Sequence, residues 1–147
     1  QLLLNQIEKL KRNITNSENV RQKQFELVVD DKLTWLCDGH LIERATQNLI
    51  TNAIRYGNFQ IKITAKTNNE QLIISIEDDG LGIKQQDYNT VFKAFTRLDE
   101  SRNKSKGGFG LGLAIVQRIA QWHQGECKLT KSTLGGAKFT LRIPKNE

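Results

Sequence analysis

The chain has 147 residues, of which 37% are hydrophobic and 26% are charged, and these values are typical of one soluble domain with its own core. No apolar run approaches the roughly 18 residues that a membrane-spanning helix needs, and no signal-peptide pattern opens the chain. The basic residues behind the net charge of +6 are scattered, so we expect a polyphosphate pocket and no nucleic-acid binding. The chain begins at Gln1 and not at Met, so we expect it to be a piece of a longer protein.

The beginning of the chain is predicted to lead into the domain proper. Residues 1–12 have apolar positions near helical spacing, and a polar stretch follows. We therefore divide the chain into an N-terminal helix and linker, 1–24, and a core domain, 25–147. Residues 25–29 and 34–37 have the composition of short strands on either side of a turn.

A long amphipathic helix is predicted over residues 40–56. Asp38 is placed to cap its N-terminus and Gly57 its C-terminus. Two strands follow at 60–66 and 72–76, where apolar residues alternate on both sides of an Asn-Asn-Glu turn.

The second half begins with a predicted short helix over 84–92 and a charged segment over 93–109, whose lack of periodicity indicates a mobile loop or lid. A helix over 110–123 and a closing hairpin with strands at 127–132 and 137–143 complete the chain. Helices mixed with antiparallel strands predict an α+β domain with the helices on one face of a sheet.

The helix over 40–56 has a polar stripe in which Asn48 and Asn52 lie one turn apart, with Arg55 nearby. An Asn side chain offers a neutral oxygen to a hard cation such as Mg²⁺, and an Arg can pair with phosphate oxygens. A solvated helix face is the alternative, although Asn is a mediocre helix former. The stripe alone leaves both alternatives open.

Asp78 comes at the end of a predicted strand and is followed by Gly80 and Gly82. This order puts a carboxylate beside backbone that a flat ligand can approach closely, because glycine has no Cβ. A carboxylate accepts hydrogen bonds from an exocyclic amine, which favours adenine over guanine. A surface turn with ordinary Asx chemistry is the alternative.

A third motif is the glycine-rich run from Gly107 to Leu113, which precedes a predicted helix. Free N–H groups and the helix dipole favour phosphate at such a helix start. The run follows a lid and not a strand, and no Gly-Lys-Ser/Thr follows it. It is therefore neither a Rossmann fingerprint nor a P-loop.

The order of these motifs resembles that of sensor histidine kinases, and it is most similar to the osmosensor-type kinases of Gram-negative bacteria. The similarity runs from about Phe25 to Pro144. It implies the Bergerat fold of the GHKL superfamily: a two-layer sandwich in which about three helices cover one face of a mixed, mostly antiparallel sheet, with a lid over ATP. The matching boxes, in the family's order N, G1, F and G2, are Asn48-x-x-x-Asn52-x-x-Arg55-Tyr56, Asp78-x-Gly-x-Gly, Phe92-x-x-Phe95 and Gly108-x-Gly-Leu-Gly-Leu.

The resemblance implies a role for each matched residue. Asn52 would ligate Mg²⁺, Asn48 would lie beside the phosphates, and Asp78 would accept from the adenine amine. Arg97 and Arg102 would neutralise charge on the transferred phosphoryl group and, with Asn48, form the catalytic set. The alternative is that the two arginines are ordinary solvated loop residues. The nucleotide-binding set implied in this way is Asn48, Asn52, Arg55, Tyr56, Asp78, Gly80, Gly82, Ile83, Gly108, Gly110, Leu111, Gly112 and Leu113.

The chain departs from the family pattern at two points. Ala137 stands where many members have Thr near the adenine Asp, which removes one expected contact. The phosphoacceptor box is also absent, because neither His40 nor His123 has the acidic neighbour that the box needs. We expect both histidines to be structural and the acceptor histidine to lie in an upstream part of the protein.

The residue type at position 48 helps to distinguish a histidine kinase from the ATPases and serine kinases of the same superfamily. Related ATPases and serine kinases have a Glu at this position, and a carboxamide cannot take a proton at neutral pH. The resemblance therefore implies a histidine kinase that acts on a dimerisation hairpin and passes phosphate to a response regulator. A regulatory nucleotide-binding module without transfer is the alternative. We expect this domain to be cytoplasmic and not membrane-inserted, within a parent protein in the bacterial inner membrane.

Overall fold

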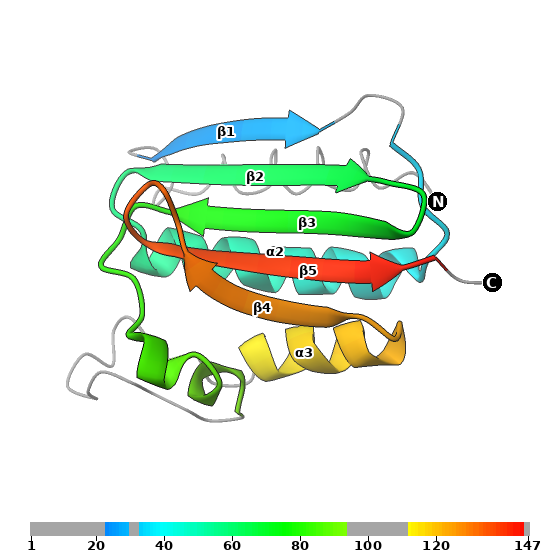
Figure 1. Ribbon diagram of the computed structural model, residues 1–147. Coiled ribbons are helices and arrows are strands. Elements are labelled where there is room, and N and C mark those ends of the chain that lie inside the picture. Colours follow the sequence, from blue (N-terminus) through cyan, green and yellow to red (C-terminus); the bar gives the residue numbers. More distant parts are fainter. Residues whose placement is uncertain (1–22, 30–32, 94–111, 146–147) are drawn as a thin grey trace.

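A computed structural model describes residues 23–29, 33–93 and 112–145 of the chain. Five strands form one mixed sheet in the order β1-β2-β3-β5-β4, with β1 parallel to β2 and the other neighbours antiparallel (Figure 1). This arrangement confirms the predicted two-layer α+β class. The elements are β1 (Gln24–Val29), α2 (Gly39–Tyr56), β2 (Gln60–Thr67), β3 (Gln71–Asp78), α3 (Gly112–Trp122), β4 (Glu126–Lys131) and β5 (Ala137–Pro144).

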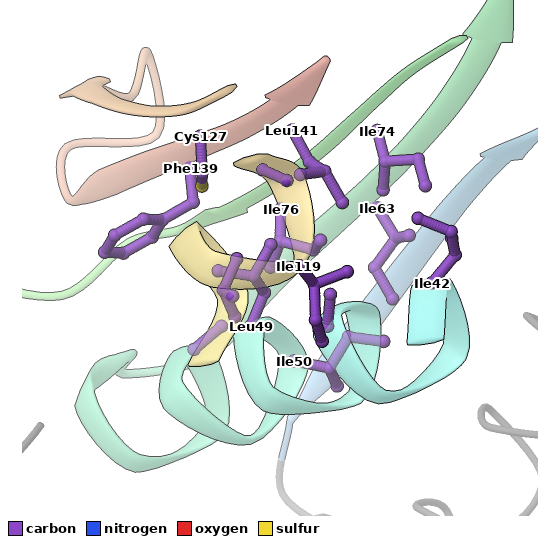
Figure 2. Packing of buried hydrophobic residues seen from close by; sticks show 14 of the residues in the cluster. Ile42, Leu49, Ile50, Ile63, Ile74, Ile76, Ile119, Cys127, Phe139 and Leu141 are labelled. Carbon is purple, nitrogen blue, oxygen red and sulfur yellow. The ribbon is translucent and has the colours of Figure 1, made fainter. Parts of the chain in front are cut away.

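The core lies between the sheet and the two helices, because alternate strand residues face the helices. Ile63, Ile76 and Leu141 lie on the sheet side of this layer, and Leu49 of α2 and Ile119 of α3 lie opposite (Figure 2). All five are at most 2% exposed. Removing such apolar side chains from water stabilises the fold by about 2 kcal/mol each. This layer fixes the positions of the helix and strand ends that carry the polar motifs.

Both ends of α2 are held as the sequence predicted. Asp38 Oδ1 accepts hydrogen bonds from the N–H groups of His40 (3.1 Å) and Leu41 (3.2 Å), which satisfies two free donors of the first turn. At the other end the Gly57 N–H donates to Ala53 O (2.7 Å). Lys23 Nζ donates to Gly57 O (2.6 Å), and a cation at a helix C-terminus also complements the helix dipole.

Two predicted elements were wrong in type. Residues 34–37 form no strand, and the next residue, Asp38, donates its N–H to His123 Nε2 (3.2 Å) just after α3. The predicted helix over 84–92 consists of two 3₁₀ helices, Gln85–Asp87 and Thr90–Phe92. Val91 is the only residue of these two turns that is buried, so the segment lacks the apolar stripe that would support a longer helix.

Parts of the other predicted elements lie outside the described residues. These parts are the first helix, almost all of the lid over 93–109, and residues 110 and 111 of the predicted helix start. The division of the chain at residues 24 and 25 stays a prediction. None of the helices within residues 23–29, 33–93 and 112–145 is long and apolar enough to cross a bilayer.

Candidate functional site

Asp78 is the last residue of β3 and is only 3% exposed. Its Oδ1 accepts hydrogen bonds from the N–H groups of Gly80 (2.9 Å) and Ala137 (3.3 Å). Burial raises the pKa of Asp78 above its ordinary value, although these two backbone donors oppose part of that rise. Both donors bind Oδ1, and the described residues supply no donor to Oδ2, so this second oxygen can be offered to a ligand.

Two glycines allow the backbone to close around Asp78. A Cβ at Gly80 would collide with the carbonyl oxygen of Tyr56 at the end of α2. A Cβ at Gly136 would collide with Asp78 Oδ1 itself. Gly82 has a φ of +76°, a conformation that glycine adopts without strain. The sequence predicted Gly80 and Gly82 for the close approach of a ligand, which stays a prediction; at Gly80 the contact with the Tyr56 carbonyl is a reason within the fold itself.

The neighbouring carboxylate, Asp79, has a different environment. Its Oδ1 accepts from the N–H groups of Asn58 (2.9 Å) and Phe59 (2.8 Å), in the connection between α2 and β2. Burial alone would raise the pKa of Asp79, but hydrogen bonds from backbone N–H groups of residues 58–60 outweigh it and hold the pKa below its ordinary value. Asp79 therefore fixes a loop, and Asp78 is the carboxylate that is available for recognition.

The polar stripe of α2 meets the beginning of α3. Asn48 Nδ2 donates to Gly112 O (3.2 Å), which joins two of the predicted motifs across 64 positions of sequence. Asn52, one turn further along α2, is 8% exposed, and Arg55 is exposed at the last turn. Tyr56 is half-buried, and its carbonyl packs against Gly80. The stripe thus extends from the first turn of α3 to the loop after Asp78.

The first turn of α3 is less crowded than the surroundings of Asp78. Leu113 is 1% exposed and belongs to the core, whereas a Cβ at Gly112 would meet no atom of residues 23–29, 33–93 or 112–145 within 4 Å. Packing therefore explains Leu113 but gives no reason for Gly112. Gly108, Gly110, Leu111, Arg97, Arg102 and Phe95 lie outside the described residues, so their predicted roles stay predictions.

Two apolar residues flank the site. Phe92 packs edge-on against the ring of Phe139 in β5, with ring centroids 5.9 Å apart and an interplanar angle of 86°. This contact fixes the chain where the predicted lid begins. Ile83 is half-buried and packs against the core after the Gly82 turn.

His123 has both ring nitrogens next to backbone groups. Its Nδ1 lies 2.9 Å from Ile119 O, and its Nε2 accepts from the Asp38 N–H. Because a carbonyl oxygen can only accept, Nδ1 carries the proton in this arrangement. His123 thus joins the end of α3 to the cap of α2, which agrees with the expected structural role.

A group of residues behind Asp78 was not predicted from the sequence. Ser132 Oγ donates to Glu77 Oε1 (2.8 Å), and both side chains are buried. The turn between β4 and β5 that contains Ser132 also supplies Gly136, whose N–H donates to Asp78 O (3.1 Å). The Gly-Gly pair in this turn was the available signal, but it predicted a hairpin turn and nothing about the turn's contacts.

The sequence and fold of this chain are similar to those of known proteins. Residues 37–147 match the model of the family described as histidine kinase-, DNA gyrase B-, and HSP90-like ATPase. The chain is 37% identical over 103 residues to the sensor histidine kinase CpxA of Escherichia coli K12, an alignment that covers 70% of this chain and 22% of CpxA. It is 40% identical over 107 residues to the sensor protein RstB of the same strain, covering 73% of this chain and 25% of RstB. The chain therefore spans a quarter or less of the length of these relatives.

Solved structures have the same fold. The ATP-binding domain of PrrB from Mycobacterium tuberculosis superposes with a TM-score of 0.77 at 24% identity, over 97% of this chain and 93% of that one. The histidine kinase domain of the Escherichia coli osmosensor EnvZ superposes with a TM-score of 0.65 at 32% identity, over 94% of this chain and 85% of that one.

Proposed function

The chain belongs to the family of histidine kinase-, DNA gyrase B- and HSP90-like ATPases, as an ATP-binding domain of the histidine kinase type, and from this premise we propose that it transfers the γ-phosphoryl group of Mg-ATP to a histidine. The acceptor would be on the dimerisation hairpin of the sensor kinase to which the domain belongs, and the phosphate would then pass to a response regulator. The observation that carries the proposal is the buried Asp78 carboxylate at the end of β3.

Asp78 suits adenine because of the atoms that it leaves for a ligand. Its Oδ1 is bound to the backbone of Gly80 and Ala137, so Oδ2 would accept from the 6-amino group. Guanine has a carbonyl oxygen at the corresponding position, which would face the carboxylate unfavourably. Ala137 contributes its backbone N–H to Asp78, so this position supports the site although it lacks the hydroxyl of many relatives.

The α2 stripe and the beginning of α3 would receive the phosphates. Asn52 offers one neutral oxygen to Mg²⁺, an ion that usually takes few protein ligands and completes its shell with phosphate and water. When bound, Mg²⁺ would neutralise phosphate charge. Asn48, held by Gly112 O, would lie beside the phosphates, and the first N–H groups of α3 would face them.

Asn48 also supports transfer to histidine over hydrolysis. A carboxamide cannot take a proton from water or from a hydroxyl group at neutral pH, whereas a neutral imidazole attacks without that help. Phosphoryl transfer then depends on alignment and charge stabilisation, for which Arg97 and Arg102 are the proposed cations. The proposed setting is a domain outside the bilayer in a parent kinase of the inner membrane, without nucleic acid as a partner.

Calorimetric titration with ATP, ADP and GTP, with and without Mg²⁺, tests the site. We expect adenine nucleotides to bind and GTP not to bind. Asp78→Asn should weaken ATP binding by about 10- to 100-fold, because a hydrogen bond to a charged group is worth about 1.5–3 kcal/mol. A folded sample that binds no nucleotide would contradict the assignment.

A second experiment separates the kinase from the regulatory module. Radiolabelled ATP, this domain and a separately supplied histidine hairpin should yield an acid-labile, alkali-stable phosphohistidine. Nucleotide binding without any transfer to hairpins of related kinases would instead favour the regulatory module.

A further inference from the structure

We propose that Glu77 and Ser132 are positioning residues for adenine recognition, because their buried hydrogen bond holds the β4–β5 turn against Asp78. This inference rests on the proposed function, in which Asp78 binds the adenine amine. Neither residue would touch the nucleotide. Their effect would reach it through the turn at residues 132–136 and the backbone donor of Ala137.

The turn is closed by its own hydrogen bonds, with Ser132 at the centre. The Ser132 N–H donates to Gly136 O (2.8 Å), and the Gly135 N–H donates to Ser132 O (3.0 Å). The Ser132 hydroxyl accepts from the Leu134 N–H (3.0 Å) while it donates to Glu77 Oε1 (2.8 Å). Gly135 has a φ of +110°, so the turn geometry depends on glycine there. A change at Ser132 therefore acts on the whole turn.

The turn contacts the end of β3 from both faces of the sheet. Glu77 and Asp78 are consecutive in β3, so their side chains point to opposite faces. On one face Glu77 binds Ser132; on the other, Asp78 Oδ1 accepts from the Ala137 N–H (3.3 Å). The register between β3 and β5 ends at Glu77 and Lys138, so the ladder of paired strands does not extend to Asp78. Beyond the ladder, the Gly136 N–H donates to Asp78 O (3.1 Å), and the side-chain contacts of Glu77 and Asp78 hold the turn together with this bond.

The Glu77–Ser132 hydrogen bond is well placed to act as a positioning contact because both groups are shielded from water. Glu77 is 6% exposed and Ser132 is 2% exposed. If Glu77 lost its acceptor oxygen, the Ser132 hydroxyl would be left buried without this acceptor, which is costly enough to move the turn. A shift of the turn would carry Ala137 and its N–H away from Asp78 and change the direction in which the carboxylate points.

The test compares ATP with purine riboside triphosphate, which lacks the 6-amino group, by calorimetry on the 147-residue chain. The measured quantity is the ratio of the two affinities. Glu77→Ala and Ser132→Ala should each lower this ratio on the order of 3- to 10-fold. Glu77→Gln should preserve it, because an amide oxygen still accepts from Ser132. In an Asp78→Asn background, Ser132→Ala should have no further effect on the ratio.

Ser75→Ala is the matched control. Ser75 Oγ lies 3.5 Å from Thr140 Oγ1, another buried side-chain contact between β3 and β5 on the same sheet face, two residues before Glu77. It should leave the ratio unchanged.

The outcomes are distinguishable. If Glu77→Ala and Ser132→Ala weaken both ligands equally, or change neither, Glu77 and Ser132 only support the fold and the inference is overturned. It is also overturned if Glu77→Gln lowers the ratio of ATP affinity to analogue affinity as much as Glu77→Ala does. If the unmodified chain does not prefer ATP to the analogue, the adenine contact of the proposed function is wrong, and the inference is overturned with it.

Discussion

The end of β3 and the beginning of α3 lie on either side of the proposed ligand and are built in opposite ways. Around Asp78 the backbone is crowded, and side chains at Gly80 or Gly136 would collide with neighbouring atoms. At Gly112, by contrast, no atom of the described residues lies within 4 Å of an added Cβ. The proposed adenine side is therefore shaped by the fold itself, whereas packing among the described residues gives no reason for the glycine on the proposed phosphate side. The proposed phosphate contacts would account for Gly112.

The largest expected effect is that of Gly80→Ala. The new methyl group would collide with the carbonyl oxygen of Tyr56, and such overpacking costs about 1–3 kcal/mol. Urea unfolding at pH 7 would measure the loss. An alanine that costs less than 0.5 kcal/mol, or about half the smallest expected loss, would remove the contrast between the two regions.

Asp78 and Asp79 allow a smaller but sharper test within the crowded region. The pKa of Asp78 is raised, so its contribution to stability is present at low pH and is lost as pH rises through the folded-state value. The pKa of Asp79 is lowered, so its contribution is present at neutral pH and is lost as pH falls below about 4.

Replacing each aspartate by asparagine should therefore change the stability at pH 7, relative to that at pH 3, in opposite directions. Asp78→Asn removes a buried charge, so its effect on stability should be more favourable at pH 7 than at pH 3. Asp79→Asn should destabilise the fold at pH 7 and do so less at pH 3. Unfolding curves at the two pH values give the answer. Equal pH dependence in the two variants would show that the two carboxylates have equivalent environments.

The smallest expected stability effect is that of Gly112→Ala. Because the site has room for a methyl group, the change should stabilise the fold by about 0.5 kcal/mol through the unfolded state. ATP affinity should fall nonetheless, since the proposed phosphate contacts need close approach to the backbone. A variant that is destabilised would show that Gly112 has a packing role after all.

Local signals in the sequence predicted the parts of the structure that depend on neighbouring residues. Asp38 caps α2 as expected, because a cap involves only the next few N–H groups. The predicted strand at 34–37 was wrong because strand composition does not supply a partner strand, and the residue that follows it, Asp38, binds His123 through its backbone N–H. Such a contact, between residues 85 positions apart, leaves no local pattern.

In the candidate site, too, the sequence predicted residues with local signals and missed residues whose contacts are distant in sequence. The strand end and the two glycines after it predicted Asp78 as a recognition residue, and the structure brings Asn48 and Gly112 together as their order suggested. Glu77, Ser132 and Gly136 were missed because their contacts cross from β3 to the far hairpin. Nothing near Glu77 in the sequence distinguishes it from an exposed strand residue.

The contacts around Asp78 join parts of the chain that are distant in sequence, and this affects the order in which the structure forms. Its donor at Ala137 lies 59 positions further along the chain, and the two hairpins, β2–β3 and β4–β5, can each pair locally before β3 and β5 meet. Closing so long a loop is entropically costly and is expected to come late. The proposed recognition site would then be among the last features of this domain to form, so a chain still emerging from the ribosome could not use it until β5 was in place.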